Sequence, residues 1–274
     1  MKEMTIQEIK ECSLGILDFV DNVCRENNLV YYLCGGTLLG AVRHEGFIPW
    51  DDDIDIMMPR RDYERLFDIW PCECQYKALY YKNTPDFPYA YGKIIDNRTI
   101  KIEPYRKKCR LIGVDIDVFP IDNLPDDDME TVKYYNAIAK IQSKLALQIS
   151  TYRKGSTILR TVAKNGMRLY ERIIESLGIT SIDKTTESFD RLAQKYNQTE
   201  TEFCGITSIS HYGIREKNQK SNFNTKVSVN FEGKEYPAPN GYADYLSRLY
   251  GKNYMQLPPV EMRHTHHSYK AFWK

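Results

Sequence analysis

The chain has 274 residues, of which 42% are hydrophobic and 12% aromatic, and its net charge at pH 7 is +1. This composition supports a large buried core and excludes an intrinsically disordered chain. The near-neutral charge indicates no polyanionic partner, and we expect no binding to nucleic acid. Seven cysteines at irregular spacing are typical of a reducing compartment and not of a disulfide framework.

The N-terminal residues carry charges where a signal peptide has an apolar run, and no stretch reaches the roughly 18 apolar residues that cross a bilayer. We therefore expect a cytoplasmic protein. Peripheral attachment to the inner face of the membrane stays open.

The first part of the chain alternates between helical and strand patterns of hydrophobicity. In chain order it predicts a helix over 5–28, a strand over 29–34, a short helix capped by Thr37 and running to 42, a strand over 53–57, a helix over 60–70, and strands over 76–81, 91–95 and 111–119, the last ended by Pro120.

From about residue 126 to 198 the pattern is helical, and it predicts three helices, split near 154–155 and near 178–181. Strands over 203–208 and 226–231 and a helix over 241–250 follow. The mixture predicts an α/β (α+β) fold, with a mixed-sheet core flanked by helices and a helical insertion.

The stretch GGTLLGAVRHEGFIPWDDDID, residues 35–55, ends with four carboxylates in five positions. Such crowding is costly, because like charges this close raise one another's pKa. A strand here places Asp53 and Asp55 on one face, with their Cα atoms about 6–7 Å apart, and Ile54 and Ile56 on the other. Hard divalent cations bind such oxygens and cancel their repulsion. A solvated acidic turn is the alternative, and the interleaved isoleucines favour the metal.

A glycine turn precedes this acidic strand. Gly35, Gly36 and Thr37 lie between a strand and a helix, where backbone N–H groups can hold an anion. The Gly-Gly-Thr triplet alone is a weak signal. A strand, a Gly-Gly-[Ser/Thr] turn and then an Asp-x-Asp strand together resemble the nucleotidyltransferase fold, in which the turn holds phosphate and the aspartates hold metal.

A third carboxylate is expected from a neighbouring strand. Residues 114–120 read VDIDVFP, which places Asp115 and Asp117 on a common strand face. Asp117 is favoured as the third acidic residue, and Asp115 is the second candidate. A charged edge strand that only aids solubility is the alternative.

The segments GTLLGAVRH (36–44) and GFIPWDDDID (46–55) together resemble the signature of the LicD family. Members of that family transfer phosphocholine from CDP-choline to bacterial surface glycans, and the fukutin-related ribitol-phosphate transferases share the signature. Glu45 departs from the pattern, since the family commonly has glycine there. Further similarities lie at YGKIID (91–96), DVFPIDNLP (117–125) and residues 245–255.

The resemblance implies roles for individual residues. Asp53, Asp55 and Asp117 would be catalytic and would bind one or two Mg²⁺ or Mn²⁺ ions, with Asp117 as the general base. For His44 a structural hydrogen bond is the alternative, and for Trp50 it is core packing. The substrate-binding residues would be Gly35, Gly36, Thr37, Arg43, His44, Trp50 and Lys93.

The resemblance also implies an organisation and a reaction. Residues 1–125 would form a nucleotidyltransferase-like catalytic core, 126–200 a basic helical subdomain, and 201–274 a C-terminal segment that completes the active site. The hydroxyl of a glycan, a lipid-linked precursor of teichoic acid or lipopolysaccharide, would attack the phosphorus bearing choline and release CMP. CDP-ribitol or CDP-glycerol as donor, a sugar-nucleotide glycosyltransferase and a cation-dependent glycan-binding module without activity stay open.

Three further features bear on ligands. Residues 131–172 hold nine Lys or Arg and a single acid, Glu171, among apolar residues, so these helices could contact an anionic membrane peripherally. Binding of the acceptor's phosphates is the alternative. His264, His266 and His267 form a weak metal-like pattern. The aromatic candidates for holding a choline ammonium are Tyr80, Tyr81, Phe87, Tyr89 and Tyr91.

Overall fold

The computed structural model describes all residues except 72–73, 105–111, 152–156 and 266–268. Its elements, in chain order, are β1 (Lys2–Glu3), α1 (Ile6–Glu26), β2 (Tyr32–Leu33), α2 (Gly35–His44), β3 (Asp55–Pro59), α3 (Arg60–Ile69), β4 (Tyr76–Leu79), β5 (Gly92–Asp96), β6 (Thr99–Ile102), β7 (Asp115–Leu124), α4 (Asp128–Ile149), α5 (Ile158–Ser176), α6 (Ile182–Ala193), β8 (Phe203–Ile206), β9 (Asn218–Gln219), β10 (Lys226–Phe231), β11 (Lys234–Pro239), α7 (Tyr242–Tyr250) and β12 (Lys270–Trp273), with short 3₁₀ helices at Gly213–Glu216, Lys220–Phe223 and Val260–Met262.

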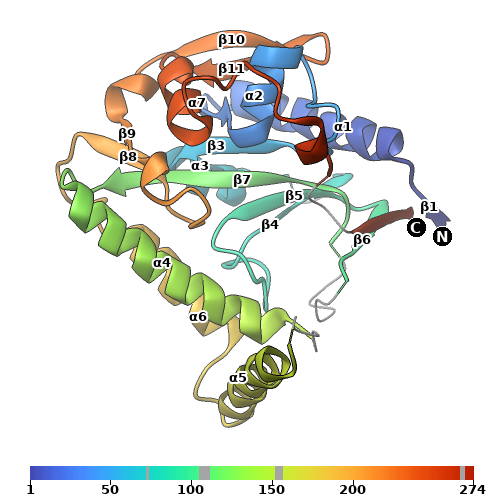
Figure 1. Ribbon diagram of the computed structural model, residues 1–274. Helices are drawn as coiled ribbons and strands as arrows, with labels where there is room; N and C mark the ends of the chain where they lie inside the picture. The colour runs from blue at the N-terminus through green and yellow to red at the C-terminus, as the bar shows by residue number, and fades with distance from the viewer. Residues whose placement is uncertain (72–73, 105–111, 152–156, 266–268) are drawn as a thin grey trace.

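A mixed sheet of seven strands lies at the centre. Its path is β2-β3-β7-β5-β4, and β8 pairs with the second half of β7 and with β9. Strands β3 and β7 are parallel, and their other neighbours are antiparallel. In Figure 1, α1, α2 and α7 lie above these strands and α4, α5 and α6 below them. The α/β prediction is confirmed.

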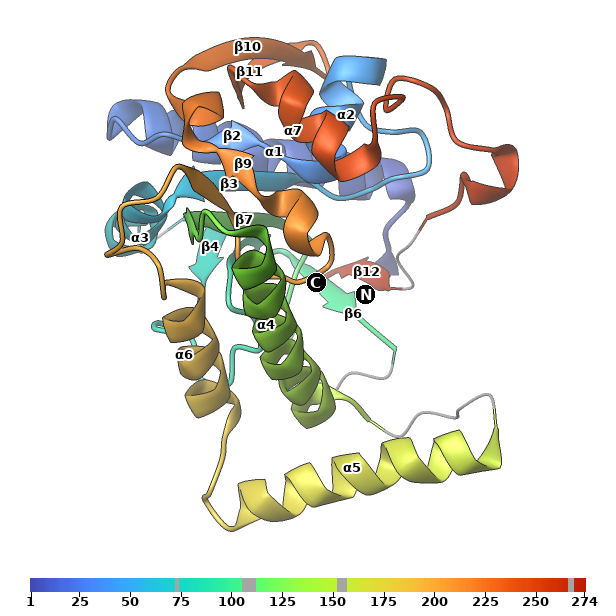
Figure 2. The same ribbon diagram turned by 60° about the vertical axis from the view of Figure 1, so that its left-hand side comes forward.

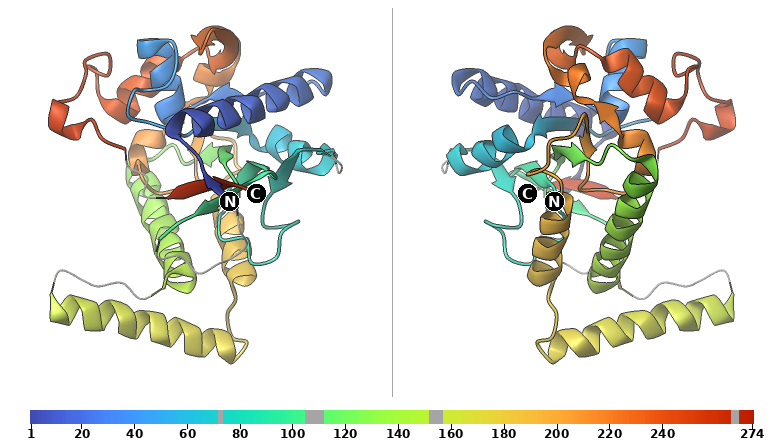
Figure 3. Two further views of the ribbon diagram at one scale, coloured as in Figure 1. Left: turned by 90° about the vertical axis from the view of Figure 1, so that its right-hand side faces the viewer. Right: turned by 90° about the vertical axis from the view of Figure 1, so that its left-hand side faces the viewer.

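Two smaller sheets complete the fold. Strands β10 and β11 form a hairpin, and β12 lies between β1 and β6. The two ends of the chain therefore lie side by side, as Figure 3 shows. None of the helices in the described part of the chain combines the length and the apolar character needed to cross a membrane.

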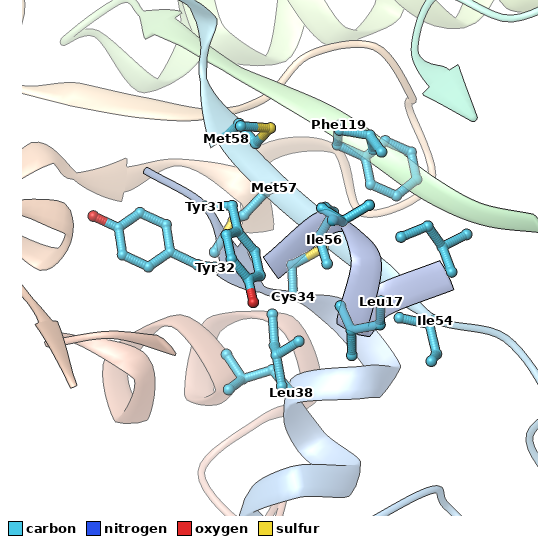
Figure 4. Packing of buried hydrophobic residues seen from close by; sticks show 14 of the residues in the cluster. Leu17, Tyr31, Tyr32, Cys34, Leu38, Ile54, Ile56, Met57, Met58 and Phe119 are labelled. Carbon is cyan, nitrogen blue, oxygen red and sulfur yellow. The ribbon is translucent and has the colours of Figure 1, made fainter. Parts of the chain in front are cut away.

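The main core cluster packs α1 and α2 against β3. Leu17 of α1, Leu38 of α2 and Ile56 of β3 are fully buried and lie in one cluster, shown in Figure 4. Helix α1 begins with a capping box: the Thr5 hydroxyl accepts a hydrogen bond from the Glu8 N–H, and the Glu8 carboxylate accepts one from the Thr5 N–H at 2.8 Å. The start of β3, where Asp55 stands, is therefore held by packed neighbours.

The predicted end of a strand at Pro120 is wrong, because β7 runs on to Leu124. Asp117 donates its N–H to Ile54 on the β3 side, so Pro120, three residues on, turns its nitrogen to the other edge. There β5 pairs only as far as Val118, and β8 begins at Ile121. The proline lies in the gap between these partners, where no ladder hydrogen bond needs its missing N–H.

Two other boundaries differ from the predictions. Helix α2 begins at Gly35, so Thr37 lies inside the helix and is not its cap. Its hydroxyl instead accepts a hydrogen bond from the Asp55 N–H at 2.8 Å. Strand β3 begins at Asp55, so Asp53 precedes it. Strands β1, β6, β9, β11 and β12 were not predicted.

The three predicted helices between 126 and 198 are α4, α5 and α6. The predicted split near 178–181 is confirmed, and the one near 154–155 lies outside the described residues. Strands of the 201–274 segment add to sheets begun earlier, since β8 pairs with β7 and β12 with β6. The three-part division of the chain stays a prediction.

Candidate functional site

Three charged residues form a row across three adjacent strands. Asp55 of β3 lies opposite Asp117 of β7, and Asp117 lies opposite Lys93 of β5. Directly paired residues share a sheet face. The sheet register thus brings together two of the three predicted metal-binding aspartates and one predicted phosphate-binding lysine.

The lysines distinguish the two aspartates of β7. The Lys93 ammonium contacts Asp115 at 2.5 Å and also contacts Asp117, and Lys101 of β6 contacts Asp115. Burial alone would raise the pKa of Asp115, but Lys101 and Lys93 outweigh it and hold the pKa well below its ordinary value. Asp115 is therefore neutralised by two cations. Asp117 shares only one of them, which favours it as the acidic residue available to a ligand.

The site carries more negative charge than its lysines cancel. Burial, and then Asp53, Asp117 and Asp51, raise the pKa of Asp55 well above its ordinary value. Burial also raises the pKa of Asp117, although Lys93 opposes it. The described residues contain no group of three His, Cys, Asp or Glu side chains already gathered as metal ligands. The residues fit a cation held by carboxylates of this cluster, Asp53, Asp55 and Asp117, whose remaining ligands come from substrate and water.

The glycine turn faces these carboxylates. Gly35 has a φ of +51°, and a Cβ there would lie 3.3 Å from an Asp55 carboxylate oxygen; at Gly36 it would lie 3.1 Å from one of Asp51. Larger side chains would crowd the acidic residues and strain the backbone at position 35. The Gly35 N–H donates to the Tyr245 hydroxyl at 3.2 Å. The two halves of the signature thus lie against each other at the first turn of α2.

Arg43 and His44 lie at the other end of α2, roughly 12 Å from the glycine turn by the rise of the helix. The Arg43 guanidinium donates to the carbonyl of Tyr254 at 2.9 Å and to the His44 ring at 3.0 Å. The His44 ring packs edge-on against Trp50, with centroids 6.5 Å apart. Burial, and then Arg43, lower the pKa of His44. The structure does not bring these three residues into contact with the aspartates.

Glu45 occupies the left-handed position that ends α2. Its φ is 55°, and its N–H bonds back to the Ala41 carbonyl. Glycine is the preferred residue in this conformation because it lacks a Cβ. Glu45, which stands where the LicD pattern commonly has glycine, therefore forms the same turn but is less favourable in this backbone conformation.

The C-terminal segment contributes three tyrosines that the sequence did not single out as site residues. The Tyr269 hydroxyl donates to Asp52 at 2.9 Å, and Lys101 lies 4.8 Å above its ring. The Tyr250 hydroxyl lies near Gly35 and accepts from Tyr212 at 3.0 Å. Tyr245 reaches the glycine turn, as described above. Their sequence signal was weak, because tyrosine is frequent throughout the chain.

Two of the five aromatic candidates for a choline site face the charged row. The Lys93 ammonium lies 4.8 Å from the Tyr89 ring centroid and 5.5 Å from that of Tyr91. Beside these two rings is a cavity of about 150 Å³. Tyr80 instead stacks on a core phenylalanine, and the Tyr81 hydroxyl bonds to Asp190. Phe87 is buried.

The histidine pattern near the C-terminus stays a prediction. The His264 ring contacts the carbonyl of Glu261 at 3.1 Å. His266 and His267 lie outside the described residues.

Glu216 is a buried acid that sequence reasoning missed. Its carboxyl Oε2 has no hydrogen-bond partner among the described residues. Burial raises its pKa to about 8, against the opposing effects of a backbone hydrogen bond with Ile206 and the charge of Arg215. It lies in the short helix Gly213–Glu216, which packs on α4 and α7. No periodic pattern marks a single acid in so short a helix.

We expect Glu216→Gln to remove a pH dependence of stability. The folded protein keeps this proton up to about pH 8, whereas an unfolded glutamate releases it near 4.5. The contribution of Glu216 to the free energy of unfolding is therefore largest below about pH 4.5. It falls by at most ~1.4 kcal/mol per pH unit between about pH 4.5 and pH 8, and it is constant at higher pH. Urea denaturation across this range checks it. Glu202→Gln, on an exposed acid, should keep the wild-type slope; an unchanged slope in Glu216→Gln would contradict the prediction.

Comparison with known proteins agrees with the geometry. The family described as LicD/FKTN/FKRP, nucleotidyltransferase domain, matches residues 28–145. The lipopolysaccharide cholinephosphotransferase LicD of Haemophilus influenzae is 31% identical over 278 residues, which cover 99% of each chain. An uncharacterized protein of Rickettsia typhi is 32% identical over 137 residues, 49% of this chain and 42% of its own. Because the similarity to the Haemophilus protein runs from end to end, the chain belongs to the LicD family.

Proposed function

We propose that the protein transfers phosphocholine from CDP-choline to a hydroxyl of a cell-surface glycan precursor and releases CMP. The observation that carries the proposal is the row formed by Asp55 and Asp117, in which the Asp55 carboxylate lies against the glycine turn. It lies in a chain similar from end to end to a lipopolysaccharide cholinephosphotransferase. The acceptor would be a lipid-linked precursor of lipopolysaccharide or teichoic acid. The enzyme would then act in the cytoplasm, at the inner face of the membrane.

Each part of the site has a role in this proposal. Asp53 and Asp55, with Asp117, would hold Mg²⁺ or Mn²⁺, which when bound neutralises charge that develops on the transferred phosphoryl group. As a carboxylate in the row close to the reacting groups, Asp117 would accept the proton of the attacking hydroxyl. The N–H groups of Gly36 and Thr37, in the first turn of α2, would bind the donor's phosphates, with Gly35 allowing their close approach.

The donor's head group would lie against Tyr89 and Tyr91. These rings already hold one cation, the Lys93 ammonium. Aromatic faces attract a quaternary ammonium in the same way, by roughly 0.5–2 kcal/mol each. This placement favours choline over the uncharged polyols ribitol and glycerol.

Release of CMP tests the proposal. The purified protein is incubated with Mg²⁺, a glycan acceptor and, in parallel, CDP-choline, CDP-ribitol or CDP-glycerol. We expect acceptor-dependent CMP release with CDP-choline. Release only with another donor would overturn the choline assignment, and release with none of them would overturn the transferase assignment and leave the glycan-binding module.

A further inference from the structure

We infer that α5 is an interfacial helix that lies flat on an anionic membrane with its apolar face in the lipid. This inference deepens the proposed function, since it names the surface on which a lipid-linked acceptor would be met. In Figure 2, α5 runs across the end of the molecule farthest from the central sheet, below α4 and α6.

The orientation of α5 is the reverse of that expected for a helix on a protein in water. Its buried residues are both charged: Arg168 and Glu171, each 8% exposed. They recur with the half-buried Thr161 and Asn165 at a spacing of three or four residues, so these four share a face. This polar face packs toward α4, where the Arg168 guanidinium donates to the Ser150 hydroxyl at 2.7 Å.

The opposite face is apolar and uncovered. Leu159, for example, is 79% exposed and Leu169 60%. A helix usually buries such a stripe against its own core, and isolated apolar residues on a surface are common, but a continuous stripe indicates a binding surface. The exposed apolar side chains of α5 and the turn after it are Ile158, Leu159, Val162, Met167, Leu169, Tyr170, Ile173, Leu177 and Ile179.

Charge selects the occupant. Exposed Lys164 and Arg172 lie on the polar face, among the residues that alternate with Thr161 and Arg168. When the apolar stripe enters the acyl region, these charges lie within about one helix diameter of the lipid head groups, a distance comparable with the Debye length. An anionic lipid surface attracts them, by about fivefold in affinity for each positive charge near the surface.

The structure also limits to one helix the membrane contact that the sequence suggests for the basic segment 131–172. Helix α4 buries Tyr134, Tyr135 and Ile138 against the rest of the protein. These apolar residues of α4 therefore serve the core. Helix α5, and not α4, is therefore the part of this segment that contacts lipid. This contact depends on its apolar residues as much as on its basic ones.

Co-sedimentation of the full chain with lipid vesicles, without donor or acceptor, tests the inference. We expect binding to vesicles that contain phosphatidylglycerol, weakened by salt, and much weaker binding to phosphatidylcholine alone. Leu169→Ser with Ile173→Ser should weaken binding about tenfold or more, since two buried apolar side chains are lost. Lys164→Glu with Arg172→Glu should weaken it at least tenfold.

Matched controls come from α4. Met129 is 70% exposed, and Lys133 is exposed on the same helix; Met129→Ser with Lys133→Glu should bind as the wild type does. Circular dichroism confirms that each variant is folded. Absence of wild-type binding, or equal loss in the α4 control, would overturn the inference.

A dimer that Leu169→Ser with Ile173→Ser dissociates, with no vesicle binding, would assign the face to a second copy and would also overturn it. Because vesicle binding needs no catalysis, it can fail while CMP release succeeds. Vesicle binding can likewise succeed while CMP release fails, so the inference and the proposed function are tested separately.

Discussion

Asp55→Asn is expected to reduce phosphocholine transfer about 10³-fold, because the site would lose several kcal/mol of stabilisation of the charge that develops on the phosphoryl group. The residue lies at the centre of the site. It pairs with Asp117 across the strands, and its carboxylate lies beside Gly35, where a Cβ would approach it to 3.3 Å. The change removes one negative charge and little volume, so the packing of β3 should survive. CMP release under saturating CDP-choline measures the effect.

The same variant should be more stable than the wild type when divalent cations are removed. The half-buried Asp55 carboxylate lies beside Asp53 and Asp117, and its neutralisation relieves their repulsion. We expect a higher midpoint of thermal unfolding in EDTA and a smaller increase on adding Mg²⁺.

Asp68→Asn, an exposed position on α3, is the matched control and should change neither activity nor midpoint. If Asp55→Asn keeps a tenth of the activity, the catalytic assignment is wrong. If it unfolds at a lower temperature in EDTA, the repulsion argument is wrong.

Arg60→Met is expected to destabilise the fold by about 3–5 kcal/mol, the cost typical of breaking a buried ion pair from one side. The Arg60 guanidinium contacts Asp122 at 2.5 and 2.7 Å and Asp190 at 2.8 Å. The exposed fraction of the side chain is 0% for Asp122 and 4% for Asp190. Burial alone would lower the pKa of Arg60, but the two carboxylates outweigh it and raise it. Without the arginine, two carboxylates are left buried and uncompensated.

Urea denaturation measures this loss. Arg65→Met, on an exposed arginine of the same helix, should change stability by no more than about 0.5 kcal/mol. Arg60→Met combined with Asp122→Asn should recover part of the loss, because one uncompensated charge is gone. A loss in Arg60→Met no larger than in Arg65→Met would contradict the prediction. The cluster joins α3, β7 and α6, so the variant tests how firmly the helical region is attached to the sheet.

Elements with a regular apolar pattern could be predicted from the sequence. Helix α1 was identified because its apolar residues recur at helical spacing, and its Thr5–Glu8 capping box marks the start. The neighbouring positions of Asp55 and Asp117 followed from two short alternating strands and the LicD signature. The sequence cannot supply the register that sets Lys93 beside Asp117, since it depends on contacts between strands far apart in the chain.

Other features left no adequate signal. The hairpin of β10 and β11 turns at Glu232 and Gly233, both with positive φ, whereas the strong signals for such a turn are Asn-Gly and Asp-Gly. Strands β1 and β12 are too short to show a period. For α5 the pattern is clear, but a pattern does not say which face meets the protein. The usual assumption, that the apolar face turns inward, fails here.

The position of β12 between β1 and β6 has a consequence for the order of folding. In the described part of the chain these two strands pair with β12 and not with each other, so the three-stranded sheet cannot close until β12, made much later than either, has docked between them. Lys101 on β6 neutralises Asp115, and Tyr269 next to β12 binds Asp52. A chain that has formed only its central sheet therefore carries the acidic cluster without these partners. Pairing between strands so far apart in the sequence is slow in folding. Closure of this small sheet supplies the partners that offset part of the repulsion within the acidic cluster.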